Sequence, residues 1–184
     1  MAKRTVFLHL GPVVPGIDAL HQALGRDPAL AATGVALPDV DQELMDRADV
    51  EIRRRHKAVG VRRKDVEGSW AKVCRRARKA KADCFVSVPA FFDATPEQAA
   101  LALDGLAGSK VVLVVTSGFD VEPPAAWLTQ VRQDRVHVLP SHLSDEQLAA
   151  QVARIALMEE ERRLDKRLAK VSGRRRQVDR GLAA

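Results

Sequence analysis

The sequence predicts a three-layer α/β fold, in which a parallel sheet of about four or five strands is flanked by helices and followed by a long C-terminal helix. Two observations lead to this prediction. Short apolar runs rich in Val, Leu and Phe alternate along the chain with segments of helical periodicity. These runs are apolar at consecutive positions, which is typical of parallel strands that are covered on both faces.

The first part of the chain predicts one strand and two helices. Residues 5–10 read as a buried strand, and a Gly-rich turn over residues 11–16 follows it. Apolar residues at helical spacing predict a helix over residues 17–31. Residues 34–38 predict a short extended piece, and residues 40–57 predict a helix with an Arg-rich outer side.

The middle of the chain continues the alternation. Residues 60–68 predict a loop, after which Ser69 is placed to cap the next helix. Residues 84–89 read as the second buried strand. Thr95 followed by Pro96 is typical of a helix start, because Thr caps the free N–H groups and Pro tolerates the first helical position.

The last part predicts two further strands and the long helix. Residues 111–115 form a continuous apolar run and predict a central strand. A short helix is expected after Pro124, and residues 136–139 predict the fourth strand. Ser144 begins a capping-box pattern, so the final helix is expected to start there and to end near Gly173.

The C-terminal helix divides into two parts. We assign residues 1–156 to the α/β domain and residues 157–184 to a charged helical extension. The extension carries an apolar stripe at heptad-like spacing, interrupted by Glu161, that consists of Leu157, Leu164, Leu168 and Val171. Because the earlier part of the helix suffices to cover the sheet, the stripe favours association with another copy or a protein partner, with packing along the domain as the alternative.

The net charge of +6 is concentrated in two segments. Residues 46–81 contain 14 Lys or Arg against 5 Asp or Glu, and residues 154–180 contain 10 against 5. Such segments form either a solvated helix face or a binding surface for a polyanion or an acidic protein. The possible polyanion-binding residues are Arg53, Arg54, Arg55, Arg62, Arg63, Lys72, Arg75, Arg76 and Lys79.

Several classes of protein are disfavoured. No apolar run reaches the roughly 20 residues of a membrane span, and the N-terminus leads into a strand without a signal-peptide pattern, so a cytoplasmic protein is expected. Cys74 and Cys84 predict buried, inert thiols, and His9 and His137 lie in predicted strands, where packing is the simplest role. No metal-binding spacing and no nucleophile motif is present, so no metal, cofactor or catalytic residue is assigned.

The first strand, the turn and the expected helix start have the arrangement of a phosphate-binding loop. Such loops hold phosphate with backbone N–H groups at a helix N-terminus, together with a Lys and a small hydroxyl residue. This turn keeps Gly11 and Gly16, but it carries Val14 and Asp18 instead of a Lys and a hydroxyl residue. Its two prolines have no N–H to donate. The loop therefore predicts a vestigial site.

Six stretches together resemble the bacterial sulfotransferase-like family of P-loop folds. They lie at 6–11, 30–35, 68–70, 94–99, 111–116 and 124–127, and the resemblance covers about residues 4–140. Members of this family bind phosphoadenylyl sulfate. The resemblance places Val14 where the family has Lys, and Ile17 and Asp18 where it has hydroxyl residues. It also finds no Arg after the third strand, where the family uses one around the 3′-phosphate.

The favoured function is therefore non-catalytic: a degenerate sulfotransferase-like domain that acts as a binding or assembly module. The first alternative is an enzyme, a divergent sulfotransferase or other transferase with a rearranged site. The second is a polyanion-binding or nucleic-acid-binding protein that uses the Arg-rich helices.

Overall fold

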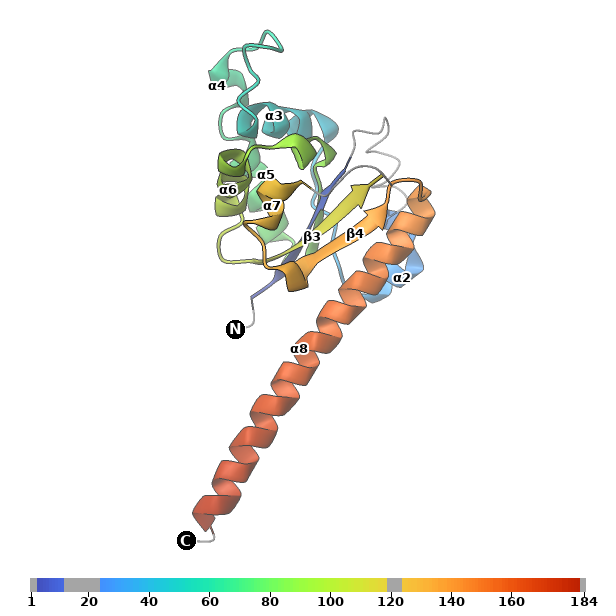
Figure 1. Ribbon diagram of the computed structural model, residues 1–184, viewed down its shortest axis with the longest axis vertical. Coiled ribbons are helices and arrows are strands. Elements are labelled where there is room, and N and C mark those ends of the chain that lie inside the picture. Colours follow the sequence, from blue (N-terminus) through green and yellow to red (C-terminus); the bar gives the residue numbers. More distant parts are fainter. Residues whose placement is uncertain (1–2, 12–23, 119–123, 183–184) are drawn as a thin grey trace.

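A parallel sheet forms the middle layer of the molecule (Figure 1). The computed structural model describes residues 3–11, 24–118 and 124–182, and within them the sheet has four strands. They are β1 (Thr5–Leu10), β2 (Cys84–Ser87), β3 (Lys110–Ser117) and β4 (Val136–Pro140), in the order β2-β1-β3-β4. All pairings are parallel, and β3 lies between β1 and β4. The predicted fold class is thus confirmed, as is the interior position of the third strand.

One face of the sheet is covered by a group of helices from the middle of the chain (Figure 1). They are α3 (Gln42–Ile52), α5 (Ser69–Lys79), α6 (Pro96–Gly105) and the short α7 (Ala125–Leu128). The alternate strand residues Leu8, Leu10 and Leu113 enter this core with Trp70 and Trp127. Both indole N–H groups are satisfied: Trp70 donates to Ala102 O at 2.9 Å and Trp127 donates to Phe91 O at 2.8 Å.

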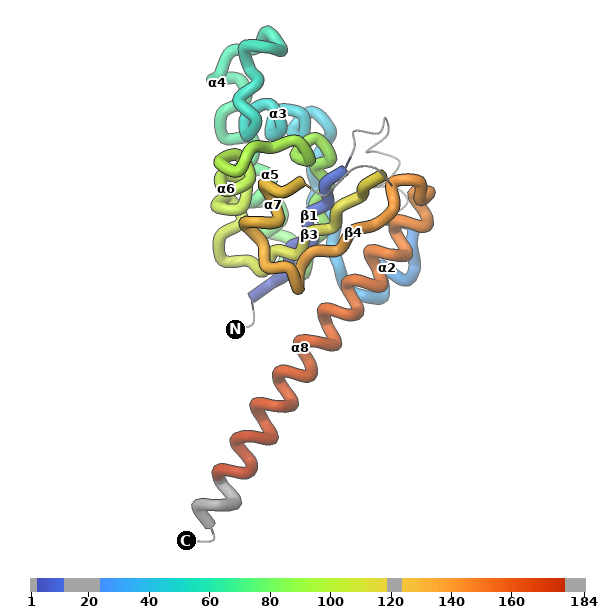
Figure 2. The backbone as a smooth tube through the Cα atoms, in the orientation of Figure 1, coloured from blue at the N-terminus to red at the C-terminus, as the bar shows by residue number. Residues whose placement is uncertain are grey.

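The other face is covered by α2 (Pro28–Ala32) and by the first half of α8 (Asp145–Leu182), as the backbone trace also shows (Figure 2). The opposite set of strand residues, among them Phe7, Phe85 and Val114, packs here against Leu148 and Val152 of α8. Because successive side chains along a strand point to opposite faces of the sheet, the strands contribute to two separate cores. Beyond the domain, α8 continues as a single projecting helix (Figure 1).

The cap of α5 differs from the prediction. Ser69 is the first residue of the helix and is buried, and the cap position belongs to Gly68, whose φ of 81° lies in the left-handed region that favours glycine. The free N–H groups of Gly68 and Trp70 instead donate to the Glu51 carboxylate of α3, at 2.7 Å each. The Glu51 carboxylate, from another helix, thus takes the role that was predicted for the Ser69 hydroxyl. Residues next to α5 in the sequence do not indicate this contact.

Several element boundaries also differ. The helix expected over residues 17–31 is broken at Asp27, which caps α2 while Pro28 occupies its first turn. Helix α3 ends at Ile52, five residues before the predicted end at residue 57, and Arg54 adopts a φ of 56°. The loop expected over residues 60–68 contains a one-turn helix, α4 (Arg63–Val66).

Two further elements end elsewhere than expected. Strand β2 stops at Ser87, and Pro89 opens a 3₁₀ turn, η1 (Pro89–Asp93), because its ring cannot donate to a neighbouring strand. Helix α8 does not end near Gly173 but runs through it to Leu182. A glycine inside a helix costs about 1 kcal/mol, which a long helix tolerates. The predicted cap at Thr95 is present and is completed by Gln98 to a capping box, and the predicted capping box at Ser144 is present.

Candidate functional site

The carboxyl edge of the sheet is the place where an open α/β fold binds ligands. The chain runs from β1 to β2 on one side and then returns to β3 on the other, so the strand order reverses between β1 and β3. At this point three polar residues from three strands converge. His9 Nδ1 lies 2.8 Å from Ser87 Oγ, and His9 Nε2 lies 3.2 Å from Thr116 Oγ1.

The hydrogen bonds of this cluster form a continuous chain from Ser87 through His9 and Thr116 to Leu10 O. The Thr116 hydroxyl donates to Leu10 O at 3.3 Å, so it accepts from His9 Nε2–H, and a further hydrogen bond joins His9 Nδ1 and Ser87 Oγ. The imidazole is also stacked on Phe85, with 5.9 Å between ring centroids. All three polar side chains are buried. This arrangement holds the imidazole in place and joins the ends of three strands.

Gly11 has a packing reason that is independent of phosphate. A Cβ atom built at this position would lie 1.9 Å from Thr116 Oγ1, so only glycine allows the end of β1 to pass Thr116. Of the four residues of the predicted vestigial loop, only Gly11 lies in the described part of the chain. Val14, Gly16 and Asp18 lie outside the described residues.

The described carboxyl edge offers little for anion binding or metal chemistry. The residues that end the strands there are Gly11, Ser87, Ser117 and Pro140, and they bring no lysine or arginine. Among the described residues no group of His, Cys, Asp or Glu is placed to hold a metal ion. Burial raises the pKa of the Cys74 and Cys84 thiols to about 12, which keeps both protonated and unreactive at neutral pH.

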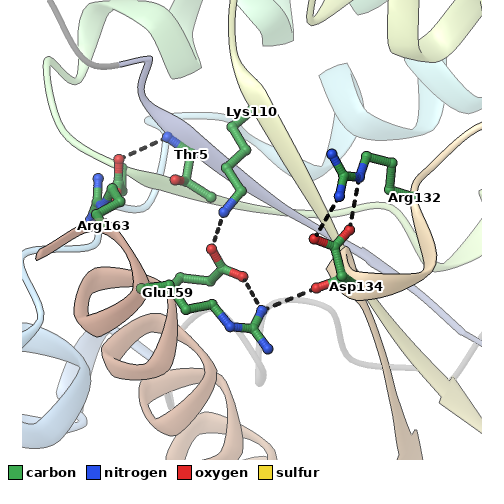
Figure 3. Close-up of polar contacts among 8 residues, drawn as sticks. Thr5, Lys110, Arg132, Asp134, Glu159 and Arg163 are labelled. Carbon is green, nitrogen blue, oxygen red and sulfur yellow. Dashed lines mark hydrogen bonds and ion pairs between the residues drawn. The ribbon is translucent and has the colours of Figure 1, made fainter. Parts of the chain in front are cut away.

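The opposite edge of the sheet holds a buried charge that the sequence reasoning missed. Glu159 of α8 is fully buried and forms ion pairs with Lys110 of β3 and with Arg162, the latter at 2.8 Å (Figure 3). Arg162 also donates to Asp134 O at 3.0 Å. The missed signal was spacing: Glu159 falls four residues after Ile155, on the same helix face that packs against the sheet.

The ionisation of Glu159 follows from these neighbours. Burial by itself raises the pKa of this carboxyl, but the Lys110 ammonium and the Arg162 guanidinium outweigh it, and the net pKa is lowered. Glu159 is therefore ionised at neutral pH. A buried carboxylate with two cationic partners fixes the position of α8 on the sheet.

A second contact lies one turn further along α8. Arg163 pairs with Asp83 at 2.7 Å, and Asp83 also accepts from the backbone N–H of Thr5 at 2.8 Å (Figure 3). Beyond it, residues 164–177 are exposed except for the half-buried Gly173. The boundary placed between residues 156 and 157 therefore lies inside a continuous helix, whose ion pairs with the domain extend to Arg163.

The predicted apolar stripe lies on the side of α8 that faces away from the sheet. At 100° per residue, Leu157 is turned about 180° from Leu148, which packs on the sheet. Accordingly the side chains of the stripe are exposed, by 51% at Leu157, 49% at Leu164, 64% at Leu168 and 63% at Val171. Four large apolar side chains thus form a row along the helix that their own domain does not cover.

The nine predicted polyanion-binding residues divide into two groups. Four of them have partners within the chain: Arg53 with Asp49 and with Ala90 O, Arg62 with Asp65, Arg63 with Glu67, and Arg76 with Asp39 O. The other five, Arg54, Arg55, Lys72, Arg75 and Lys79, are exposed. Lys72, Arg75 and Lys79 follow one another at helical spacing along α5, so they share one outer face.

A pocket of about 360 Å³ lies between α3, α4 and α6. It combines cationic side chains, Arg54, His56 and Arg63, with the carboxylates of Glu51 and Glu67. Because Glu51 caps α5 and Glu67 pairs with Arg63, most of these charges are already neutralised inside the protein. The pocket therefore lacks a strong preference for one charge of ligand.

Comparisons with protein-family models, with curated proteins and with solved structures find no match to this chain. None of the helices that the structure describes combines the length and the apolar character that crossing a membrane requires.

Proposed function

We propose that this chain is a non-catalytic assembly module: a sulfotransferase-like α/β domain that holds α8 in a fixed position for association with another helix. The observation that supports this proposal is the exposed stripe of Leu157, Leu164, Leu168 and Val171 on a helix that projects from the domain. Single exposed apolar residues are ordinary, but four in one row on a projecting helix are typical of a helix–helix interface.

The length of the projecting part supports the same proposal. Residues 164–182 extend about 28 Å beyond the last ion pair with the domain, at 1.5 Å per residue. Most helices in proteins owe their stability to the packing of an apolar face rather than to intrinsic propensity. Burial of the stripe against a second helix would contribute on the order of 1 kcal/mol for each side chain and would stabilise the helix as well.

The non-catalytic part of the proposal is supported by the carboxyl edge. There the described strand ends carry hydroxyl groups, an imidazole and a glycine, and the imidazole is already engaged by Ser87 and Thr116. The resemblance to sulfotransferase-like proteins stays a hypothesis about ancestry and fold.

The test compares the full chain with a chain that ends at Arg163. Because the ion pairs with the domain extend to Arg163, we expect both chains to fold with similar melting temperatures. Light scattering and sedimentation at about 1–200 µM should detect association of the full chain alone, with a Kd on the order of 1–100 µM. A full chain that stays monomeric, or a shortened chain that unfolds, contradicts the proposal.

Matched variants of the full chain separate the stripe from the helix itself. Leu164→Glu with Leu168→Glu places charge in the stripe and should abolish association. Lys166→Ala with Lys170→Ala changes the opposite side of the same helix and should leave association within about threefold, since surface changes have small effects. Equal behaviour of the two double variants would show that the stripe is not the interface.

A second candidate function is the binding of a polyanion by α5. The specific observation is the exposed row of Lys72, Arg75 and Lys79, whereas Arg62 and Arg63 are paired with Asp65 and Glu67. Three exposed cations at helical spacing can contact successive phosphate or sulfate groups.

A further inference from the structure

We propose that the partner of α8 is a second copy of this chain, bound antiparallel, with Glu160 of each copy facing Arg174 of the other. This inference rests on the proposed function, because it names the partner and the orientation for the same apolar stripe.

The stripe follows a heptad repeat. Leu157, Leu164 and Val171 are seven residues apart and occupy one of the two core positions, d. Leu168 occupies the other core position, a, together with Glu161 and Arg175, which lie seven residues before and after it. The apolar core is therefore centred between Leu164 and Leu168. It has an acidic residue towards the domain and a basic residue towards the tip.

A parallel pair in register would bring like charges together. Each core residue would then face its own copy, so that Glu161 would face Glu161 and Arg175 would face Arg175. At the flanks of the core, Glu160 would face Asp165 of the second copy, again with like charge. Each of these contacts opposes the parallel arrangement.

An antiparallel pair brings fewer like charges together than a parallel pair. If Leu164 faces Leu168 of the second copy, the two-fold axis repeats this contact, and all four leucines meet at the centre. The same register places Glu161 beside Val171 of the second copy and Arg175 beside Leu157. At the flanks of the core it brings Glu160 opposite Arg174 of the second copy twice, while Arg167 and Asp165 each face their own counterpart once. Glu160 and Arg174 are both exposed, so both are available for this pair.

The domain leaves the stripe open from Leu157 towards the tip of α8. Leu148 and Val152 pack on the sheet from other sides of the helix, and Leu157 is 51% exposed. Ala153, one turn before Leu157 on nearly the same side, is buried, and α2 also contacts α8, so the open part of the stripe begins at Leu157. The ion pairs of Glu159 hold that part of α8 still, which presents the stripe at a defined angle.

Charge reversal in the full chain tests the orientation. At low salt, where surface ion pairs are least screened, Glu160→Arg and Arg174→Glu should each raise the dimer Kd by about tenfold. The double variant Glu160→Arg with Arg174→Glu restores opposite charges and should return the Kd to within about threefold of the original. In a parallel dimer, Glu160→Arg would instead strengthen association, because the new side chain would face Asp165.

A distance measurement provides a second, independent readout. A spin label on Gln177→Cys in the full chain should give label separations on the order of 30 Å in an antiparallel dimer, since residue 177 then lies opposite residue 155. In a parallel dimer the two labels would lie within about 15 Å. Cys74 and Cys84 are buried and stay unlabelled.

The outcomes distinguish the two proposals. Association that requires the stripe but strengthens with Glu160→Arg, or that brings the labels close together, overturns the antiparallel pairing and leaves the assembly function standing. A full chain that is monomeric up to about 200 µM overturns self-association and the assembly proposal together.

Discussion

At the scale of single residues, the buried polar groups decide where this chain is held together. His9 is satisfied by two hydroxyl groups at the carboxyl edge, and Glu159 is satisfied by two cations at the amino edge. Both groups are buried, so leaving either without its partners would be unfavourable. The two clusters differ in function: the first joins three strands, and the second attaches α8 to the sheet.

Glu159→Gln should lower the free energy of unfolding by about 1–3 kcal/mol at pH 7, because it leaves Lys110 without its counter-charge. The lower part of this range is favoured, since the Arg162 side chain is 44% exposed and keeps some solvation. Chemical denaturation of the original chain and the variant measures the difference. Glu160→Gln, an exposed neighbour, is the control and should change stability by less than about 0.5 kcal/mol.

The difference in the free energy of unfolding between the original chain and Glu159→Gln should depend on pH. The pKa of Glu159 is lowered in the folded chain, so its stabilising contribution is complete above the carboxyl pKa of the unfolded chain, about 4.3. It is lost as the pH falls through the lower folded pKa, where protonated Glu159 resembles the glutamine of the variant. Denaturation curves at several pH values should therefore converge in acid. A gap between the two chains that widens below pH ~4 would contradict this account.

At the scale of elements, helices that are all rich in basic residues have different roles. Helix α4 and its preceding Arg62 are rich in cations, yet Asp65 and Glu67 pair with Arg62 and Arg63 at helical spacing. Helix α5 ends in a basic turn and keeps an exposed row of cations on its outer face. Helix α8 combines both roles, because its first half covers the sheet and its second half carries the exposed stripe.

If the chain binds a polyanion, we expect α5 to be the contact. Lys72→Gln, Arg75→Gln and Lys79→Gln together should weaken binding to heparin and reduce its salt dependence by up to about three released counterions. The control is Arg62→Gln with Arg63→Gln, which removes cations that already have partners and should have a smaller effect. Retention on a heparin column, measured at several salt concentrations, compares the triple variant with the control variant. Binding that is absent at low salt, or insensitive to salt, would leave α5 as an ordinary solvated face.

At the scale of the whole molecule, the two edges of the sheet separate two functions. The carboxyl edge lies where open α/β folds bind ligands, while α8 leaves the domain past the amino edge, beside Lys110 and Thr5 (Figure 3). The assembly proposal uses only the second region. A divergent transferase, in contrast, would need the first region to hold an anionic donor.

Binding of adenosine 3′,5′-bisphosphate and phosphoadenylyl sulfate separates these two possibilities. We expect calorimetric titration of the full chain to give no saturable heat up to about 1 mM of either ligand. The reason is that one charge-assisted contact to phosphate contributes about 1.5–3 kcal/mol, and the resemblance to sulfotransferase-like proteins would place Val14 where those proteins have Lys. A sulfotransferase that binds the donor serves as the positive control. Saturation of this chain at micromolar ligand would favour the transferase alternative.

Residue type and spacing alone determine much of this protein. The apolar runs at residues 5–10 and 111–115, the capping boxes at Thr95 and Ser144, and the stripe on the last helix follow from local chemistry. Only the tertiary structure decided the rest, because it depends on residues that are distant in sequence. Glu51 caps α5 from another helix, Thr116 limits the end of β1 to glycine, and Lys110 converts Glu159 from an apparent surface charge into a buried anchor.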